Sequence, residues 1–137
     1  MKANRFNFRV LDKEYNQMVY PDGNGYFQLT NDTVITGDGD LFDLENQEIV
    51  ENCVLMQSTG LVDKNGKEIF EGDIINITKE FEDLMDEVFY DEELCSIRLK
   101  GYSNDYCDFA DWIREGFKFE VIGNIYENQE LLKKLKD

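Results

Sequence analysis

The 137-residue sequence contains no histidine, a single proline and only three cysteines. Without histidine, a serine or cysteine nucleophile lacks its usual general base, and a zinc site lacks its usual nitrogen ligand. The cysteines are odd in number and widely spaced, which predicts neither a disulfide framework nor a metal site. We expect reduced, mostly packed thiols in a reducing cytoplasm at Cys53, Cys95 and Cys107.

Basic residues are scarce as well. The 14 lysines and arginines are set against 30 acidic residues, which gives a formal net charge of −16. Direct binding to nucleic acid or to an anionic membrane surface is therefore not expected, since both require a basic surface. The sequence has no long apolar run and no secretory hydrophobic segment, so we expect neither membrane insertion nor export. The partner that this charge favours is a protein with a positive patch.

What remains is typical of a globular protein that is mainly β. Hydrophobic residues make up 42% of the chain and aromatic residues 13%, more than a disordered chain carries. Phe6, Phe8 and Val10 alternate with polar residues, which is the period of a half-buried strand. Asn65-Gly66 predicts a tight hairpin turn, because both residues tolerate positive φ. Similar signals predict strands at 17–20, 26–29, 33–36, 53–57, 74–77, 95–99 and 117–126, a loop or short edge segment at 41–52, a short helix within 106–115 and a final helix after an Asn128 N-cap.

Residues 80–93 carry eight acidic side chains and no basic one. The apolar residues Phe81, Leu84, Met85 and Val88 have helical spacing, which predicts one short helix. A loop between strands is the alternative, because like charges repel one another in a compact structure. The run is either a solvated face or an interaction surface, and the candidate members of that surface are Glu82, Asp83, Asp86, Glu87, Asp91, Glu92 and Glu93.

Two other groups of side chains are each open to two interpretations. The N-terminal strand has a positive polar edge, which would attract the acidic run of another subunit or would simply be solvated. Its members are Lys2, Arg5, Arg9 and Lys13. An aromatic group near the second predicted helix would form either a stacking surface or, as we expect, part of the core. Its members are Tyr102, Tyr106, Phe109 and Trp112.

Carboxylates between residues 63 and 73 invite a metal-binding or catalytic interpretation. Asp63, Asn65 and Glu68 resemble the start of a calcium loop, but Lys67 and Glu68 occupy the positions that require an oxygen ligand and a glycine. We expect these polar residues to serve a hairpin turn instead.

Asp73 could act as a general acid or base with a neighbouring glutamate. With 30 acids in the chain, accidental pairs are common. We expect instead that Gly72 permits a sharp turn and that Asp73 accepts hydrogen bonds from nearby backbone amides. The sequence therefore predicts no catalytic residue, no cofactor site and no metal site.

Three blocks of the sequence resemble the YopX family of phage and prophage proteins. They are Phe6–Lys13 with Met18–Tyr20, Leu55–Ile74, and Phe119–Asn128 with Glu130–Leu132. Gln129 stands where the family usually has proline. The resemblance implies a phage-encoded protein in the cytoplasm of a bacterial host, with an SH3-like barrel in its C-terminal part and no established activity.

Together these observations predict a mainly β protein with a few short helices. We expect an N-terminal β region at 1–52 and an SH3-like barrel with a C-terminal helix at 53–137. The leading function is a non-enzymatic accessory protein that contacts other proteins, namely a second copy of itself or a host or phage protein. The alternative is an acidic decoy that mimics nucleic acid and occupies a basic host protein. A carboxylate-dependent hydrolase is a third class.

Overall fold

The computed structural model describes residues 7–13, 16–20, 33–35, 41–43, 48–49, 53–102 and 104–137. Two compact units make up the chain, Asn4–Ser58 and a second unit that consists mainly of Thr59–Asp137. The described residues form a mainly β structure with two short helices, as predicted. No helix in this described part is long and apolar enough to cross a membrane.

In the first unit, strand β1 (Phe8–Asp12) pairs antiparallel with β2 (Gln17–Val19) and with the beginning of β6 (Cys53–Val62). The alternation at Phe8 and Val10 thus produces the predicted strand. Arg9 departs from the prediction of a positive edge, because only 1% of it is exposed and its Nε donates to Met56 Sδ at 3.4 Å. Lys13 is exposed. Lys2 and Arg5 lie outside the described residues.

The first unit also contains three short antiparallel strands. These are β3 (Thr33–Ile35), β4 (Leu41–Asp43) and β5 (Glu48–Ile49), with β4 in the middle. The predicted strand at 33–36 is confirmed, and the segment expected to be a loop or short edge contributes two short strands. The predicted strand at 26–29 lies outside the described residues.

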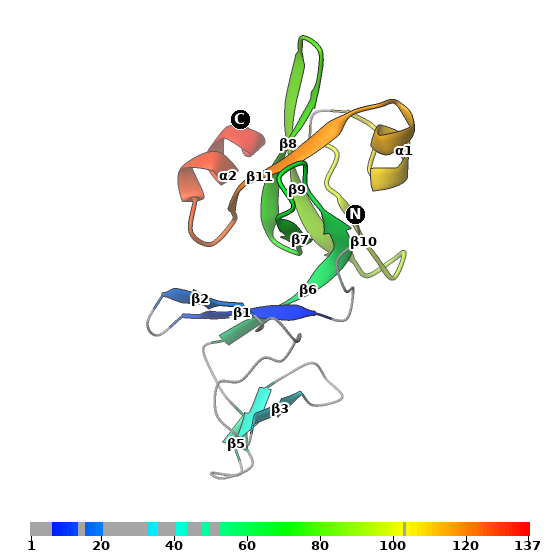
Figure 1. The fold of residues 1–137 in the computed structure, drawn as a ribbon. Helices are drawn as coiled ribbons and strands as arrows, with labels where there is room; N and C mark the ends of the chain where they lie inside the picture. Colours follow the sequence, from blue (N-terminus) through cyan, green and yellow to red (C-terminus); the bar gives the residue numbers. More distant parts are fainter. Residues whose placement is uncertain are drawn as a thin grey trace. The chain divides into compact units, whose positions relative to one another are not determined.

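The second unit is built on a four-stranded antiparallel sheet with the order β10-β9-β8-β11 (Figure 1). The bounds are β8 Asp73–Lys79, β9 Glu82–Asp91, β10 Ser96–Leu99 and β11 Lys118–Asn124. The neighbouring strand β7 (Glu68–Phe70) pairs with the end of β6. This arrangement is compatible with the predicted SH3-like barrel.

The acidic run is neither the helix nor the loop that its sequence predicts, because residues 82–91 form strand β9. A helix would bring acids three and four residues apart next to one another. A strand sends successive side chains to opposite faces and pairs Glu82 with Lys79 on β8. The strand therefore separates the charges, and it also places Leu84 opposite Ile77.

The core of the second unit lies between this sheet and helix α1 (Phe109–Arg114). Trp112 is 1% exposed, and its indole N–H donates to the carbonyl oxygen of Tyr106 at 3.3 Å. Phe109 is 9% exposed and meets the ring of Phe119 edge-on, with the ring centres 5.4 Å apart. The expected core role is therefore confirmed for Trp112 and Phe109, whereas Tyr102 and Tyr106 are partly exposed.

Helix α2 (Gln129–Lys136) follows a tight turn at the end of β11, so the two helices flank this strand in the chain (Figure 1). Asn128 stands at the predicted N-cap position but makes no side-chain capping bond. Its Oδ1 instead accepts from the backbone N–H of Asn124 at 3.0 Å. The same side chain covers Gly123, where an added Cβ would lie 2.5 Å from Asn128 Oδ1. The turn therefore depends on a residue without a side chain at position 123.

Candidate binding site: a pocket and a hairpin tip

The turn between β6 and β7 is organised by one carboxylate. Asp63 Oδ1 accepts from the backbone N–H groups of Asn65 and Lys67 at 2.9 and 2.8 Å. Its Oδ2 accepts from the N–H of Val121 on β11 at 2.9 Å. Gly66 has φ +83°, so the predicted Asn-Gly hairpin turn is confirmed.

The hydrogen bonds of Asp63 also determine its charge. Burial by itself would raise the pKa of this carboxyl, but the N–H groups of Val121, Lys67 and Asn65 and the charge of Lys67 outweigh burial and lower it. Asp63 is therefore an ionised structural residue. It acts through its hydrogen bonds, as the sequence predicts for this turn.

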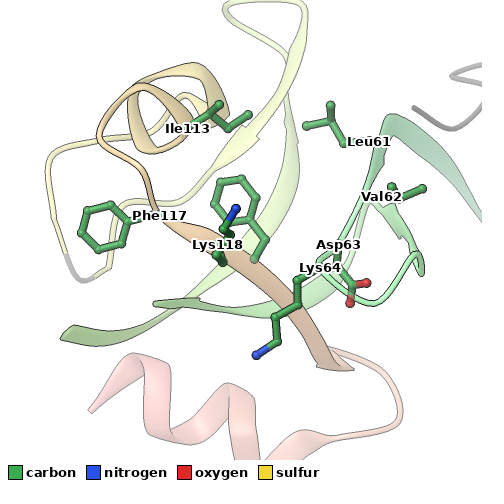
Figure 2. Close-up of a pocket in the computed structure, with 8 residues that line it drawn as sticks. Leu61, Val62, Asp63, Lys64, Ile113, Phe117 and Lys118 are labelled. Atoms are coloured by element: carbon green, nitrogen blue, oxygen red, sulfur yellow. The ribbon is translucent and has the colours of Figure 1, made fainter. Parts of the chain in front are cut away.

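A pocket of about 400 Å³ lies beside this turn, entirely within the second unit. This volume is in the range of small-ligand sites. In Figure 2, Ile113 of α1 and Leu61 of β6 lie on opposite sides, with Lys118 of β11 drawn between them. The apolar lining residues are Leu61, Val62, Ile113, Phe117 and Phe119, and the charged ones are Asp63, Lys64 and Lys118.

The two lysines at the pocket differ in their surroundings. Lys64 Nζ lies 3.2 Å from Glu120 Oε2, an ion pair whose members are both partly exposed. Lys118 is exposed and makes no ion pair with any residue in the described ranges. Asp63 is directed to backbone N–H groups and Lys64 is paired with Glu120, so Lys118 is the charged lining residue that a guest could meet beside the apolar ones.

The tip of the β8–β9 hairpin is the second feature of interest. Phe81 at this tip has a relative exposure of 102%, the largest among the exposed large hydrophobic residues of the described part. It is flanked by Glu80, whose φ of +54° makes the turn, and by the exposed acids Glu82 and Asp83. The tip therefore presents one aromatic ring surrounded by carboxylates.

Lys79 links the base of this tip to the wall of the pocket. Its Nζ donates to the carbonyl oxygen of Glu115 at 2.6 Å and lies 5.6 Å from the centre of the Phe117 ring. A cation over an aromatic face is attracted by the negative charge density of the ring. Lys79 is therefore fixed against the segment that connects α1 to β11.

The predicted acidic surface is not one continuous patch. Glu82 and Asp83 are exposed at one end of β9, and Glu92 and Glu93 are exposed just beyond its other end. Asp91 accepts from the N–H groups of Glu93 and Leu94 at 3.0 and 3.3 Å, so it organises the turn after β9. The two ends of the strand are about 30 Å apart at the usual rise per residue.

The two remaining members of the predicted surface, Asp86 and Glu87, are buried. Asp86 is 0% exposed, and its oxygens accept from the N–H groups of Glu87 at 2.8 Å and of Gly101 at 3.1 Å. Burial nevertheless raises its pKa, although the backbone hydrogen bonds oppose the shift. Asp86 thus supports the segment after β10 and cannot contact a partner at the surface.

Glu87 is 6% exposed, and the hydroxyl of Tyr102 donates to its Oε1 at 3.4 Å. Burial raises its pKa, while the charges of Lys100 and Lys136 and the bond from Tyr102 act in the opposite direction. Lys136 belongs to α2, so Glu87 is attracted by the charge of this helix's last turn. These contacts assign it a role inside the unit.

Asp73 and Gly72 fit their structural interpretations, whereas none of the three thiols is fully buried. Asp73 is 1% exposed, and its Oδ2 accepts from the N–H of Phe70 at 2.8 Å, as expected for a turn residue. The N–H of Gly72, at φ +86°, donates to the carbonyl oxygen of Val88 at 2.8 Å. The three cysteines are free thiols, but Cys95 is exposed rather than packed. Among the described residues no three acids or cysteines lie together as a metal site would require.

Sequence reasoning missed the two features that the structure brings forward. Helical spacing places Phe81 on the apolar face of a helix, and the turn at Glu80 and Phe81 contains none of the residues that usually signal a hairpin. The pocket joins residues 61–64 to residues 113–119, and the sequence contains no signal that these segments meet.

Comparison with known proteins agrees with the resemblance of the three sequence blocks. The family description "YopX protein" matches residues 7–133 of the chain. The chain belongs to the YopX family. No curated protein matches it.

Two crystal structures resemble this YopX-family chain along nearly its whole length. Protein EF1440 from Enterococcus faecalis is 32% identical with a TM-score of 0.56, and the match covers 92% of this chain and 96% of that one. Protein yopX from Bacillus subtilis is 26% identical with a TM-score of 0.57, and the match covers 96% and 97%.

Proposed function

We propose that this YopX-family chain is a non-enzymatic accessory protein of a phage or prophage that acts in the bacterial cytoplasm through protein–protein contacts. The observation that carries the proposal is the complete exposure of Phe81 at the hairpin tip. Aromatic anchors that enter a pocket on the partner supply much of the binding energy of protein interfaces. An aromatic ring that none of the described residues of its unit covers is suited to this role.

The acids around Phe81 restrict the kind of partner. Glu80, Glu82 and Asp83 would repel an acidic surface and attract a basic one. The partner would therefore present an apolar recess with lysine or arginine side chains at its edge. Its association rate with this protein should fall as the salt concentration rises.

The alternatives are less well supported by the geometry. A nucleic-acid mimic needs closely spaced carboxylates, whereas β9 separates its exposed acids into two groups and buries Asp86 and Glu87. A hydrolase needs a carboxylate that is available to a substrate. Asp63, the carboxylate at the pocket, already accepts three backbone hydrogen bonds, and Asp73 does not line the pocket.

A pair of matched variants tests the proposal. Phe81→Ser removes the exposed ring at the β8–β9 tip, and Leu94→Ser removes a 58% exposed apolar side chain from the turn after β9. In an affinity capture from host cells, with the tagged chain and its partners quantified at several salt concentrations, Phe81→Ser should lose specific partners that Leu94→Ser retains. Equal capture by both variants and the wild type would contradict the proposal.

The decoy alternative gives a different result in the same assay. Reversing the charges of Glu82 and Asp83 while Phe81 is kept should weaken capture and change its salt dependence if the tip is an aromatic anchor with a charged rim. A decoy would instead lose a DNA-binding host protein and release the DNA-binding activity of that protein.

A further inference from the structure

We propose that the pocket beside the β6–β7 turn receives the β8–β9 hairpin tip of a second copy of this chain, with Phe81 inserted between Ile113 and Leu61. The inference rests on the proposed function and names one partner for the tip. It joins two features of the same unit, an uncovered aromatic ring and an apolar pocket.

The shapes of the two features are compatible. The pocket has a volume of about 400 Å³ and apolar walls from β6, α1 and β11, and no tight cavity has to open before a ring can enter. Phe81 is the single large apolar residue at its turn and is fully exposed, so it does not occupy the pocket of its own chain. Removal of both apolar surfaces from water favours the contact.

The charges are complementary as well. Lys118 lines the pocket without an ion-pair partner in the described part, whereas Lys64 beside it is paired with Glu120. Glu80, Glu82 and Asp83 surround the ring that would enter the pocket. Two copies of a chain with a net charge of −16 repel one another in most orientations. The orientation that brings the carboxylates of the tip to Lys118 replaces part of this repulsion by attraction. The charge of Lys118 therefore favours this contact, and the lysines of α2 (Lys133, Lys134 and Lys136) are the competing basic surface that the control below addresses.

The contact would be heterologous, because the tip and the pocket are different surfaces. Each copy would use its tip toward one neighbour and its pocket toward another. Contacts of this type continue from copy to copy and produce a ring if the rotation closes or a filament if it does not.

Two variants that are each defective in one surface provide the test. Phe81→Ser keeps the pocket and loses the ring, whereas Lys118→Glu keeps the ring and loses the pocket charge. Neither variant alone should form the contact, but their mixture should, because the first supplies an intact pocket and the second an intact tip. Lys133→Glu makes the same charge change on an exposed α2 residue and serves as the matched control.

Sedimentation velocity and tryptophan fluorescence measure the outcome. Trp112 is the only tryptophan, and its ring meets that of the pocket residue Phe117 edge-on, with centres 4.8 Å apart. Filling the pocket should therefore change its emission. We expect each single variant to weaken self-association at least about tenfold, as for hot-spot residues. We expect the mixture to form a one-to-one complex, and Lys133→Glu to behave as the wild type.

The inference is overturned if the mixture does not associate, or if Lys118→Glu alone associates as the wild type does. These results are distinct from failure of the proposed function. A Phe81→Ser variant that loses its host partner, together with a Lys118→Glu variant that keeps it and self-associates normally, would leave the tip as a binding surface and remove the pocket as its receptor. Circular dichroism of each variant verifies that the fold is retained.

Discussion

The backbone N–H of Val121 donates a hydrogen bond of 2.9 Å to Asp63 Oδ2, across 58 residues of sequence. The N–H of Lys64 adds a second link, to the carbonyl oxygen of Phe119 at 2.9 Å. Through these bonds the β6–β7 turn is attached to β11. The residues on either side of the pocket therefore keep their spacing because one buried carboxylate accepts hydrogen bonds from both segments.

Replacement of Asp63 by asparagine should destabilise the protein, because an amide cannot accept all three backbone hydrogen bonds. We expect a loss of about 1–3 kcal/mol in the free energy of unfolding at pH 7. The pKa of Asp63 is lowered in the fold, so its contribution is complete above its unfolded value and is lost as the pH falls through the lower folded value. Urea unfolding at pH 7 and below about pH 4 should show the difference from wild type narrowing with acid.

The matched control for this prediction is Asp105→Asn, which neutralises an exposed aspartate. Its effect should be small at both pH values. The free energy of unfolding of Asp63→Asn is compared with that of the wild type at both pH values. A difference that stays constant between neutral and acidic pH would contradict the assigned role of the ionised carboxylate.

At neutral pH, Glu87→Gln should change the free energy of unfolding in the direction opposite to Asp63→Asn. Burial raises the pKa of Glu87, so the folded protein holds a proton more tightly than the unfolded chain. The resulting penalty is absent in acid and grows as the pH rises through the raised pKa. We expect the variant to be more stable than wild type in thermal unfolding at pH 7 and equal to it at low pH. Destabilisation at pH 7 would show that the attraction of Lys100 and Lys136 exceeds the cost of burial.

Two aspartates of the same acidic run should differ in their response to truncation. Asp86→Ala leaves the buried N–H of Glu87 and the partly buried N–H of Gly101 without their acceptor, and a buried unsatisfied group costs about 1–3 kcal/mol. Asp83→Ala removes an exposed side chain and should change stability by no more than about 0.5 kcal/mol. Denaturant unfolding of the two variants compares them directly, and similar losses would refute the assignment of Asp86 to the interior.

Gly123 and Asn128 should be energetically coupled. Gly123→Ala places a methyl group against the Asn128 side chain and should destabilise the wild type by about 1–3 kcal/mol. In an Asn128→Ala background the same change should cost less, because the clashing amide is absent. A double-mutant cycle measured by thermal unfolding gives the coupling, and strict additivity of the two changes would argue against the contact.

The sequence predicted the fold class well because strands and turns leave local signals. The alternation at Phe8 and Val10, the Asn65-Gly66 turn and the apolar residues at 74–77 each became the expected element. Residues 82–91 did not, because their apolar positions fit helical spacing and cross-strand pairing decided the outcome. A single sequence does not state which partner a strand will have.

Burial in the acidic run was beyond sequence reasoning for a similar reason. Asp83 and Asp86 are the same residue type in the same strand, yet one is exposed and the other 0% exposed. The difference arises from Gly101 and the residues around it, which come back to cover Asp86 after β10. The pocket likewise depends on contacts between segments about 50 residues apart, whose meeting has no local signature.

Lys79 has a consequence for how copies would add to one another. This side chain belongs to the β8–β9 hairpin but is held by Glu115 and by the ring of Phe117, which lines the pocket. Because these contacts exist in the free chain, the base of the hairpin is held before any partner is met. The tip would then lose less conformational entropy on association than a hairpin with a free base, which is the advantage of preorganisation.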